Sequence, residues 1–512
     1  MNIIISDIDQ IIVSLTDLPE LINLGCANKY FYNLVSKQII MGQWLTMKNT
    51  CEKKSIDEIF IQVCKNGFLS YGMFLIKGNR INIHVKSEYA FQYSCANGHI
   101  EMARWLIHLG ESDNYSKINI HINNENAFVI SCENGHIEMA QWLIILGESD
   151  NYSKINIHGA NESAFQCSCG NRHIEVAQWL IHLGESENYN EINIHVNDEY
   201  AFRRSCENSH IEMAQWLIKL GESDNYGKIN IHANDEAAFQ YSCENGYIEM
   251  TRWLINLGES KGYGKINIHT DDEYAFICSC ENGHIAIAQW LIHLGESESY
   301  SKINIHVNGE NSFVRSCENG YIEMAQWLIK LGESENYSKI NIHGNSEDAF
   351  IRSCRNGHIE MSQWLIHLGE SENYNEINIH ADGEYAFIRS CEYGHIEIAQ
   401  WLIKLGESEN YNKINIHADG EYGFIMSCKN GHIEIAQWLI KLGESGNYSK
   451  INIHVYNEAA FQYSCQNGHI EMARWLIHLG ESQGYSKIDP SLINKYGKKL
   501  KKINYQYLTF KY

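Results

Sequence analysis

The tryptophans of this 512-residue chain recur with a strict period. From Trp105 to Trp475, eleven tryptophans follow one another at intervals of 37 residues. A cysteine, from Cys95 to Cys465, and a histidine, from His84 to His454, repeat at the same interval. A fixed period of this length is typical of repeat proteins, in which each unit buries its apolar surface against its neighbours. We therefore expect an array of stacked units and not three or four globular domains.

Each unit contains two expected helices. The second, Ile100–Leu109 in the first complete copy, is apolar over most of its circumference and is followed by Gly110, a typical helix stop. The first runs from about Glu88 to Asn97, and Asn97-Gly98 is expected to form the turn between the helices. The connector that follows is polar and ends in an alternating KINIH string, which favours a short extended arm.

The first helix has a fixed face and a varied face. Ala90, Phe91, Ser94 and Cys95 are nearly constant among the copies. The positions of Tyr89, Gln92, Tyr93 and Ala96 differ from copy to copy. Because these four lie at helical spacing on the other side, we interpret the constant face as packing and the varied face as exposed.

The segment AFQYSCANGHIEMARWLIHLG, residues 90–110, resembles the ankyrin repeat through its Gly98-His99 turn, Glu101, Leu106 and the closing Gly110. The resemblance implies an all-α repeat solenoid of stacked helix-turn-helix units that binds proteins through a concave face of first helices and extended arms. It divides the chain into residues 1–54, a degenerate repeat at 55–80, eleven repeats at 81–487, and a cap with a basic tail at 488–512. Long arrays of this kind also resemble proteins of giant amoeba-infecting viruses, which implies a host protein as partner in the host cytoplasm.

The N-terminal stretch, residues 5–40, resembles an F-box, the segment that docks onto the adaptor subunit of cullin-type ubiquitin ligases. The resemblance rests on an apolar pattern: Ile11, Ile12, Leu15, Leu18, Leu21, Leu24, Tyr30, Phe31 and Val35. It implies a second functional class, a substrate receptor that delivers a bound protein to a ubiquitin ligase. The alternative is a cap that shields the first repeat, which a solenoid needs.

Composition disfavours several other functions. A net charge of −23 argues against nucleic acid as the main partner, because such binding depends on neutralising phosphates. No stretch approaches the ~20 apolar residues of a membrane span, and the N-terminus is a poor signal peptide, so we expect an intracellular protein, which we take to be a monomer. No catalytic motif appears, and we predict no enzyme activity and no cofactor. Each unit has a connector histidine, such as His84, and most have a turn histidine, such as His99. Because neither these histidines nor the repeated cysteines converge on one point, we predict no metal site, reduced cysteines, and histidines that bond to loop backbone.

The varied face supplies the predicted partner-binding residues. Arg and Tyr are enriched at the energetic centres of protein interfaces. Arg315, Arg352 and Arg389 occupy the same position in three consecutive units, and Arg203 and Arg204 are adjacent in an earlier one. We predict that this basic stripe binds an acidic protein surface; the alternative is that the arginines pair with Glu318 and Glu392. The predicted set is Tyr93, Arg203, Arg204, Tyr241, Arg315, Arg352 and Arg389.

Overall fold

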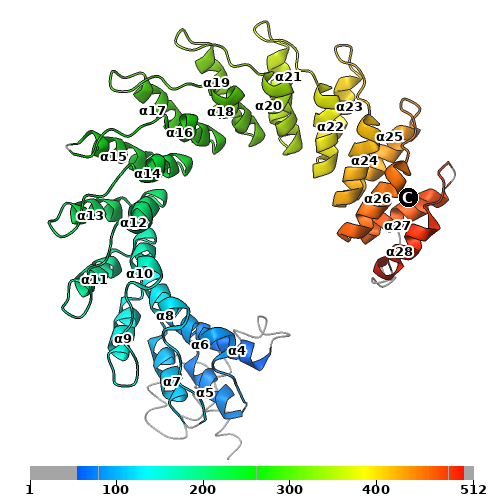
Figure 1. Cartoon of the computed structure of the whole chain (residues 1–512). Coiled ribbons are helices and arrows are strands. Elements are labelled where there is room, and N and C mark those ends of the chain that lie inside the picture. Colours follow the sequence, from blue (N-terminus) through cyan, green and yellow to red (C-terminus); the bar gives the residue numbers. More distant parts are fainter. Residues whose placement is uncertain (1–54, 79, 113, 261, 483, 501–512) are drawn as a thin grey trace, which may run out of the picture. The chain divides into compact units, whose positions relative to one another are not determined.

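The computed structural model describes residues 55–78, 80–112, 114–260, 262–482 and 484–500. These residues form 25 helices and no strand, and Figure 1 shows the helices in sequence order. The predicted F-box-like segment lies outside the described residues. The first helices of the repeats are α4 (Ile56–Lys65), α6 (Val85–Ala96), α8 (Ile122–Glu133), α10 (Gly159–Gly170), α12 (Val196–Glu207), α14 (Ala233–Glu244), α16 (Thr270–Glu281), α18 (Val307–Glu318), α20 (Gly344–Arg355), α22 (Ala381–Tyr393), α24 (Ala418–Asn430) and α26 (Val455–Asn467).

The second helices alternate with the first helices along the chain. They are α5 (Leu69–Gly78), α7 (Ile100–Gly110), α9 (Ile137–Gly147), α11 (Ile174–Gly184), α13 (Ile211–Gly221), α15 (Ile248–Glu259), α17 (Ile285–Gly295), α19 (Ile322–Gly332), α21 (Ile359–Gly369), α23 (Ile396–Gly406), α25 (Ile433–Glu444) and α27 (Ile470–Glu481). The last helix, α28 (Pro490–Leu500), begins at Pro490, as expected of a proline in a first helical turn.

The helices pack in two compact units, Met1–Ser242 with Arg252–Ile266 and Cys243–Thr251 with Asn267–Tyr512. Within the first unit, neighbouring first helices such as α6, α8, α10 and α12 pack side by side. Within the second unit, the first helices α16, α18, α20, α22, α24 and α26 also pack side by side. The last helix, α28, packs against α26 and α27. Within each unit, first helices also contact the second helix of their own repeat, as α18 does with α19. The predicted all-α repeat solenoid is therefore confirmed.

One aromatic pair recurs between adjacent repeats. The phenylalanine of each first helix is fully buried, and in most repeats its ring contacts the tryptophan of the next repeat's second helix. The ring centroids of Phe313 and Trp364 are 6.3 Å apart, in a tilted arrangement that aromatic pairs favour. At the end of the array Tyr496 of α28 takes the place of the tryptophan and lies 6.2 Å from Phe461. The constant aromatic residues thus join neighbouring repeats within each unit.

Three left-handed residues lie near the start of each first helix from α6 onward, inside the bounds given above, and form a left-handed turn. In α6 the residues Lys86, Ser87 and Glu88 have φ values of 52°, 59° and 63°. Asn, Asp and Gly adopt this conformation at the lowest cost, and they fill most equivalents of the first two positions, as Asn308 and Gly309 do. The third position is always glutamate. Regular right-handed helix therefore starts one residue after that glutamate.

The glutamate is buried and holds the arm in place. Glu88 accepts a hydrogen bond from His84 Nδ1 at 2.8 Å and another from the backbone N–H of Asn119, in the next repeat, at 3.2 Å. His84 Nε2 lies 2.9 Å from the hydroxyl of Ser116. The same histidine–glutamate contact is present in all eleven complete repeats. The connector histidines thus bond mainly to side chains, which corrects the expected bonds to loop backbone, because the left-handed turn brings the carboxylate under the imidazole.

The turn histidines do bond to backbone, as predicted. His99 Nε2 donates to the carbonyl oxygen of Lys65 in the preceding repeat at 3.0 Å, and His284 donates to that of Glu244 at 3.0 Å. A Cβ at Gly98, one repeat before His136, would lie 2.7 Å from the His136 ring. In most repeats glycine therefore provides the space that the next turn histidine occupies, besides supplying the positive φ of the turn; Arg172 and Ser209 take this position in two repeats.

These histidines are expected to make stability depend on pH. Burial lowers the pKa of His395 and His432 below the ordinary value. The unfolded chain therefore binds more protons, so this stabilisation is complete above about pH 6.5 and is lost as the pH falls through the folded-state pKa. A double variant, His395→Tyr with His432→Tyr, uses the residue that Tyr247 and Tyr321 place in two other repeats. Its melting temperature is expected to fall less than that of the wild type between pH 7.5 and pH 5; an equal fall would contradict the prediction.

Candidate protein-interaction face

The candidate interaction face consists of the varied positions on the first helices and the left-handed turns. Phe91 and its equivalents are fully buried, whereas Tyr93 and most of its equivalents are partly exposed. Cys278 and Met426 are the buried exceptions at the Tyr93 position. The Gln92 position differs from the prediction, because Gln92, Ile351, Ile388 and several other equivalents are buried. Variation there reflects side-chain packing between repeats, and exposure is concentrated at the Tyr89, Tyr93 and Ala96 positions.

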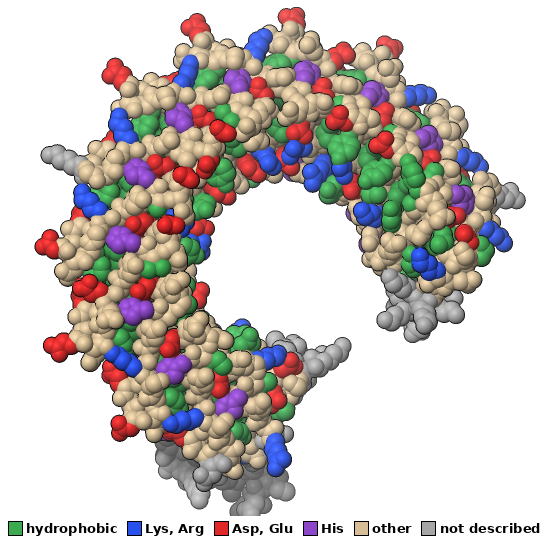
Figure 2. All heavy atoms as spheres, viewed as in Figure 1, with side chains coloured by type: hydrophobic (Ala, Val, Ile, Leu, Met, Phe, Trp, Pro, Cys, Tyr) green, Lys and Arg blue, Asp and Glu red, His purple; other side chains and the backbone are tan. Residues whose placement is uncertain are grey.

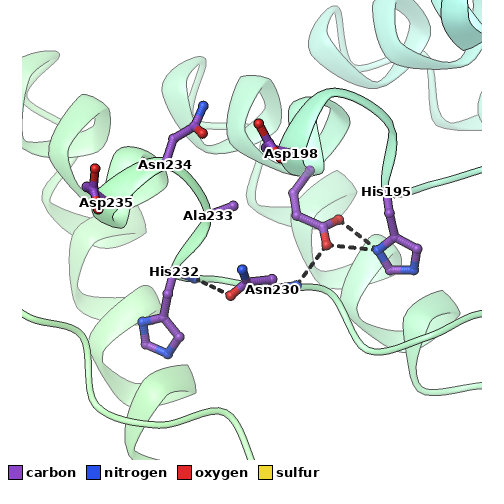
Figure 3. A pocket seen from close by; sticks show the side chains of 8 residues that line it. His195, Asp198, Asn230, His232, Ala233, Asn234 and Asp235 are labelled. Carbon is purple, nitrogen blue, oxygen red and sulfur yellow. Dashed lines mark hydrogen bonds and ion pairs between the residues drawn. The ribbon is translucent and has the colours of Figure 1, made fainter.

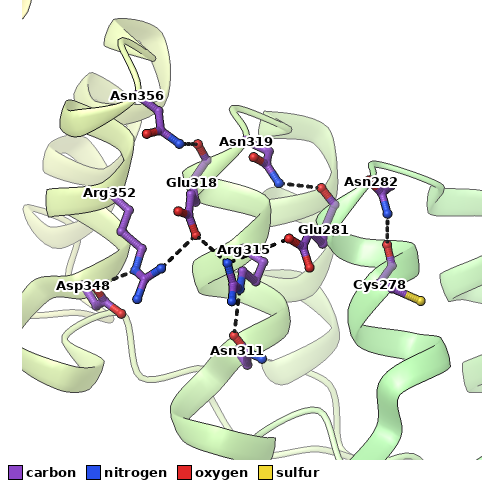
Figure 4. Close-up of polar contacts among 10 residues, drawn as sticks. All are labelled: Cys278, Glu281, Asn282, Asn311, Arg315, Glu318, Asn319, Asp348, Arg352 and Asn356. Atoms are coloured by element: carbon purple, nitrogen blue, oxygen red, sulfur yellow. Dashed lines mark hydrogen bonds and ion pairs between the residues drawn. The ribbon is translucent and has the colours of Figure 1, made fainter. Parts of the chain in front are cut away.

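The three consecutive arginines belong to a charge network, drawn in Figure 4. Arg315 Nη1 lies 3.1 Å from Glu318 Oε2 and 3.8 Å from Glu281 Oε1. Arg352 Nη1 shares Glu318 at 2.9 Å, and its Nε donates to Asp348 at 2.7 Å. Arg315 and Arg352 thus both pair with Glu318, as the alternative interpretation of the sequence expected.

Arg389 has a similar environment one repeat further on. It pairs with Glu392, and its guanidinium lies over the ring of Tyr385 at 4.2 Å. The side chains of Arg315, Arg352 and Arg389 keep 37%, 31% and 23% of their surface exposed. Positively charged arginines and negatively charged carboxylates therefore alternate along the stripe. The arginine side chains remain partly exposed, but they are paired, so the stripe is not an unpaired basic surface.

The other predicted binding residues lie on the same face of the first unit. Tyr93 is partly exposed, with its ring centroid 5.5 Å from that of Tyr89. Arg203 donates to the backbone oxygens of Asn197 and Asp198, and Arg204 pairs with Glu207 at 2.6 Å. Tyr241 is also partly exposed. These residues thus lie on three different first helices, α6, α12 and α14, and do not form a single cluster.

A polar hollow of about 430 Å³ lies between two neighbouring turns of the first unit (Figure 3). Glu199 there accepts from His195 Nδ1 at 2.8 Å and from the backbone N–H of Asn230 at 3.0 Å. The same two contacts recur in most of the arms, for example at Glu88 and Glu310. No group of three or more metal-ligating side chains is found in the described part of the chain. The hollow is therefore explained by the repeated arm structure.

The described cysteines are reduced, as predicted. All eleven repeat cysteines are free and buried. Burial raises the pKa of the Cys354 thiol to about 12, so this group stays protonated and unreactive. Among residues 55–500, apart from the few undescribed positions, only Cys167 is a partly exposed cysteine.

A second hollow, of about 510 Å³, lies on the first-helix face of α24 and α26. We call it the tyrosine hollow. Figure 2 shows hydrophobic side chains gathered over these helices. Sequence reasoning did not find it, although Tyr456, a tyrosine where most repeats have Asn or Asp, was the available signal. Its lining residues are Asp419, Tyr422, Ile425, Met426, Lys429, Tyr456, Ala459 and Tyr463.

The helix-turn-helix units agree with the comparison to known families. A family model for ankyrin repeats matches residues 60–155, 166–264, 313–415 and 405–487, which is more than half of the chain. The chain belongs to the ankyrin-repeat family. No curated protein matches it. Ankyrin repeats generally mediate protein–protein interaction. None of the helices in the described residues of this ankyrin-repeat protein has both the length and the apolar character needed to cross a membrane.

Proposed function

We propose that this ankyrin-repeat protein is a scaffold that binds a protein partner through the face of its first helices. The supporting observation is the contrast between the two sides of these helices. Phe91, Cys95 and their equivalents are constant and buried, whereas the Tyr89, Tyr93 and Ala96 positions change from repeat to repeat and are mostly accessible. Constant residues maintain the array, so the changing ones are free to follow the surface of a partner.

The charge network favours a partner with carboxylates beside the arginines. A guanidinium has five N–H donors, and Arg315 and Arg352 use only some of them on Glu281, Glu318, Asn311 and Asp348. The remaining donors of the exposed part can bind a further carboxylate. Arginine is suited to such shared, multidentate contacts.

We predict that a triple variant, Arg315→Gln, Arg352→Gln and Arg389→Gln, weakens binding of the partner at least roughly tenfold, since interface arginines often contribute 1–2 kcal/mol or more each. The measurement is affinity capture with the full chain, followed by titration of the captured protein. The matched control replaces Lys330, Lys404 and Lys441, all exposed on second helices, by glutamine. A partner that binds both variants like the wild type would contradict the role of the stripe.

A second candidate function is substrate receptor of a cullin-type ubiquitin ligase. Its support is the F-box resemblance of residues 5–40, with Ile11, Leu15 and Leu18 among the matched positions. A pull-down with the adaptor subunit tests it: binding of the full chain that is lost on deletion of residues 1–45 supports the receptor. If the full chain does not bind the adaptor, the receptor function is rejected and the passive scaffold remains as the proposed function.

A further inference from the structure

The tyrosine hollow has an apolar floor and walls of aromatic rings. Ile425 and Met426 of α24 are buried and form the floor, with 2% and 5% of their surface exposed. Tyr422 from α24 and Tyr463 from α26 are accessible from the hollow. The hollow thus combines apolar side chains with hydroxyl and charged groups, and a concave site that offers both kinds of contact is a candidate binding site.

Tyr456 is the most unusual residue of the hollow. This residue is 68% exposed, and its φ is 50°, a left-handed conformation that is unfavourable for a bulky residue. The other ten complete repeats place Asn, Asp, Lys or Ala at this position. Gly420 makes room for the ring, because a Cβ there would lie 2.7 Å from the tyrosine hydroxyl. The stability of the array alone does not explain an exposed aromatic residue in this conformation.

The two ends of the hollow carry opposite charges. Asp419 lies among the left-handed residues at the start of α24, and Lys429 lies in its last turn. Neither forms an ion pair with another described residue; Lys429 only approaches the ring of Tyr463, at 6.0 Å. The regular helix between them, from Tyr422 to Lys429, spans roughly 10 Å, which corresponds to about three residues of an extended peptide.

We propose that the tyrosine hollow is the docking site for an extended segment of the partner protein. The segment carries a large apolar side chain, which enters the hollow between Tyr422, Tyr456 and Tyr463. A cationic residue on one side of it pairs with Asp419, and a carboxylate on the other side pairs with Lys429. This inference rests on the protein-binding role proposed above and places its main contact one repeat beyond the arginine stripe.

Charge argues against three other occupants of the tyrosine hollow: residues 501–512 of this chain, a nucleic acid and a second copy of the chain. Residues 501–512 contain Lys501, Lys502 and Lys511 but no acidic side chain, so none of their side chains can pair with Lys429. A nucleic acid would bring a phosphate for every nucleotide towards Asp419. A second copy of a chain with net charge −23 would be repelled as a whole.

The test is a selection of random nine-residue peptides displayed on phage against the full chain. Enriched peptides are expected to carry an aromatic or large aliphatic residue between a Lys or Arg and an Asp or Glu. Selection against Lys429→Glu is expected to replace the acidic residue by a second cationic one. Selection against Asp419→Lys is expected to replace the cationic residue by a second acidic one. Lys441→Glu, an exposed change on α25 with the same charge difference, is expected to select the wild-type pattern.

Affinities of the selected peptides, measured by fluorescence polarisation, give the quantitative result. Tyr456→Asn is expected to weaken binding at least roughly tenfold without lowering the melting temperature, because Asn suits the left-handed conformation. Peptides that bind Tyr456→Asn and Lys429→Glu as well as the wild type would overturn the inference. If those peptides are instead lost in the triple arginine variant, the proposed scaffold function stands and only the hollow is rejected.

The remaining outcomes also decide the question. If no peptide is enriched on the wild type, the tyrosine hollow is rejected as a docking site. If partner binding is also unchanged in the triple arginine variant, the proposed scaffold function is rejected as well. Displacement of a selected peptide by a twelve-nucleotide oligothymidine, or by a synthetic peptide of residues 501–512, overturns the choice of occupant. So does a dimer, seen by light scattering, that dissociates in Tyr456→Asn.

Discussion

Replacing Phe313 by alanine is expected to destabilise the second unit by about 3–5 kcal/mol, the usual loss for a buried phenylalanine. Phe313 is fully buried, and its ring contacts Trp364 of the next repeat. In an array whose repeats contact only their neighbours, this loss falls on one interface. Urea unfolding, followed by circular dichroism and tryptophan fluorescence, is expected to separate into two transitions.

Phe461 provides the matched control for this substitution. It is equally buried, but its ring contacts Tyr496 of α28 and not another repeat. Phe461→Ala is therefore expected to loosen only the end of the array and to leave the main transition in place. A single, slightly shifted transition for Phe313→Ala would show that the recurring aromatic pair does not couple the repeats.

Replacing Glu310 by alanine is expected to cost about 3–5 kcal/mol, although the residue lies in an arm and not in the apolar core. Its carboxylate accepts from His306 Nδ1 at 3.0 Å and from the backbone N–H of Asn341 at 3.1 Å. Hydrogen bonds to charged groups are worth about 1.5–3 kcal/mol each, and the buried partners would be left without an acceptor. Urea unfolding measures the loss.

Two companion variants test the reason for the Glu310 effect. Glu310→Gln keeps one acceptor oxygen and is expected to lose about half as much stability. Glu323→Ala removes an exposed glutamate from α19 and is expected to change stability by no more than about 0.5 kcal/mol. Equal, small losses for Glu310→Ala and Glu323→Ala would show that the buried carboxylate does not stabilise the arm.

The repeat pattern made the helices and the core predictable. The constant Ala90, Phe91, Ser94 and Cys95 indicated a packing face, and all four are buried. Within-chain variation was a weaker guide to exposure, since the Gln92 position varies and is mostly buried. A side chain between two repeats changes with its neighbour as readily as one that faces a partner. The arginine pairs were only one of two interpretations, because sequence spacing does not show which glutamate of an adjacent repeat lies within reach.

The amino-acid sequence contained a local signal for the left-handed turns. Asn, Asp and Gly are concentrated at the two positions before the constant glutamate, as in Asn308-Gly309-Glu310. The role of that glutamate depends on an N–H from the following repeat, 31 residues further on, and a local pattern cannot show this contact. The partner of His306 was missed for the same reason, because only the left-handed backbone brings the two side chains together.

The amino-acid sequence by itself determined the period, the two helices of each repeat and their apolar faces, because these follow from local spacing that recurs eleven times. Only the tertiary structure decided which polar side chains pair across repeats and which remain available. Asp419, Lys429 and Tyr456 come from two different repeats, and their juxtaposition depends on how α24 stacks against α26. The physical reason is that helical periodicity depends on neighbours along the chain, whereas a binding hollow depends on distances between residues about 37 positions apart.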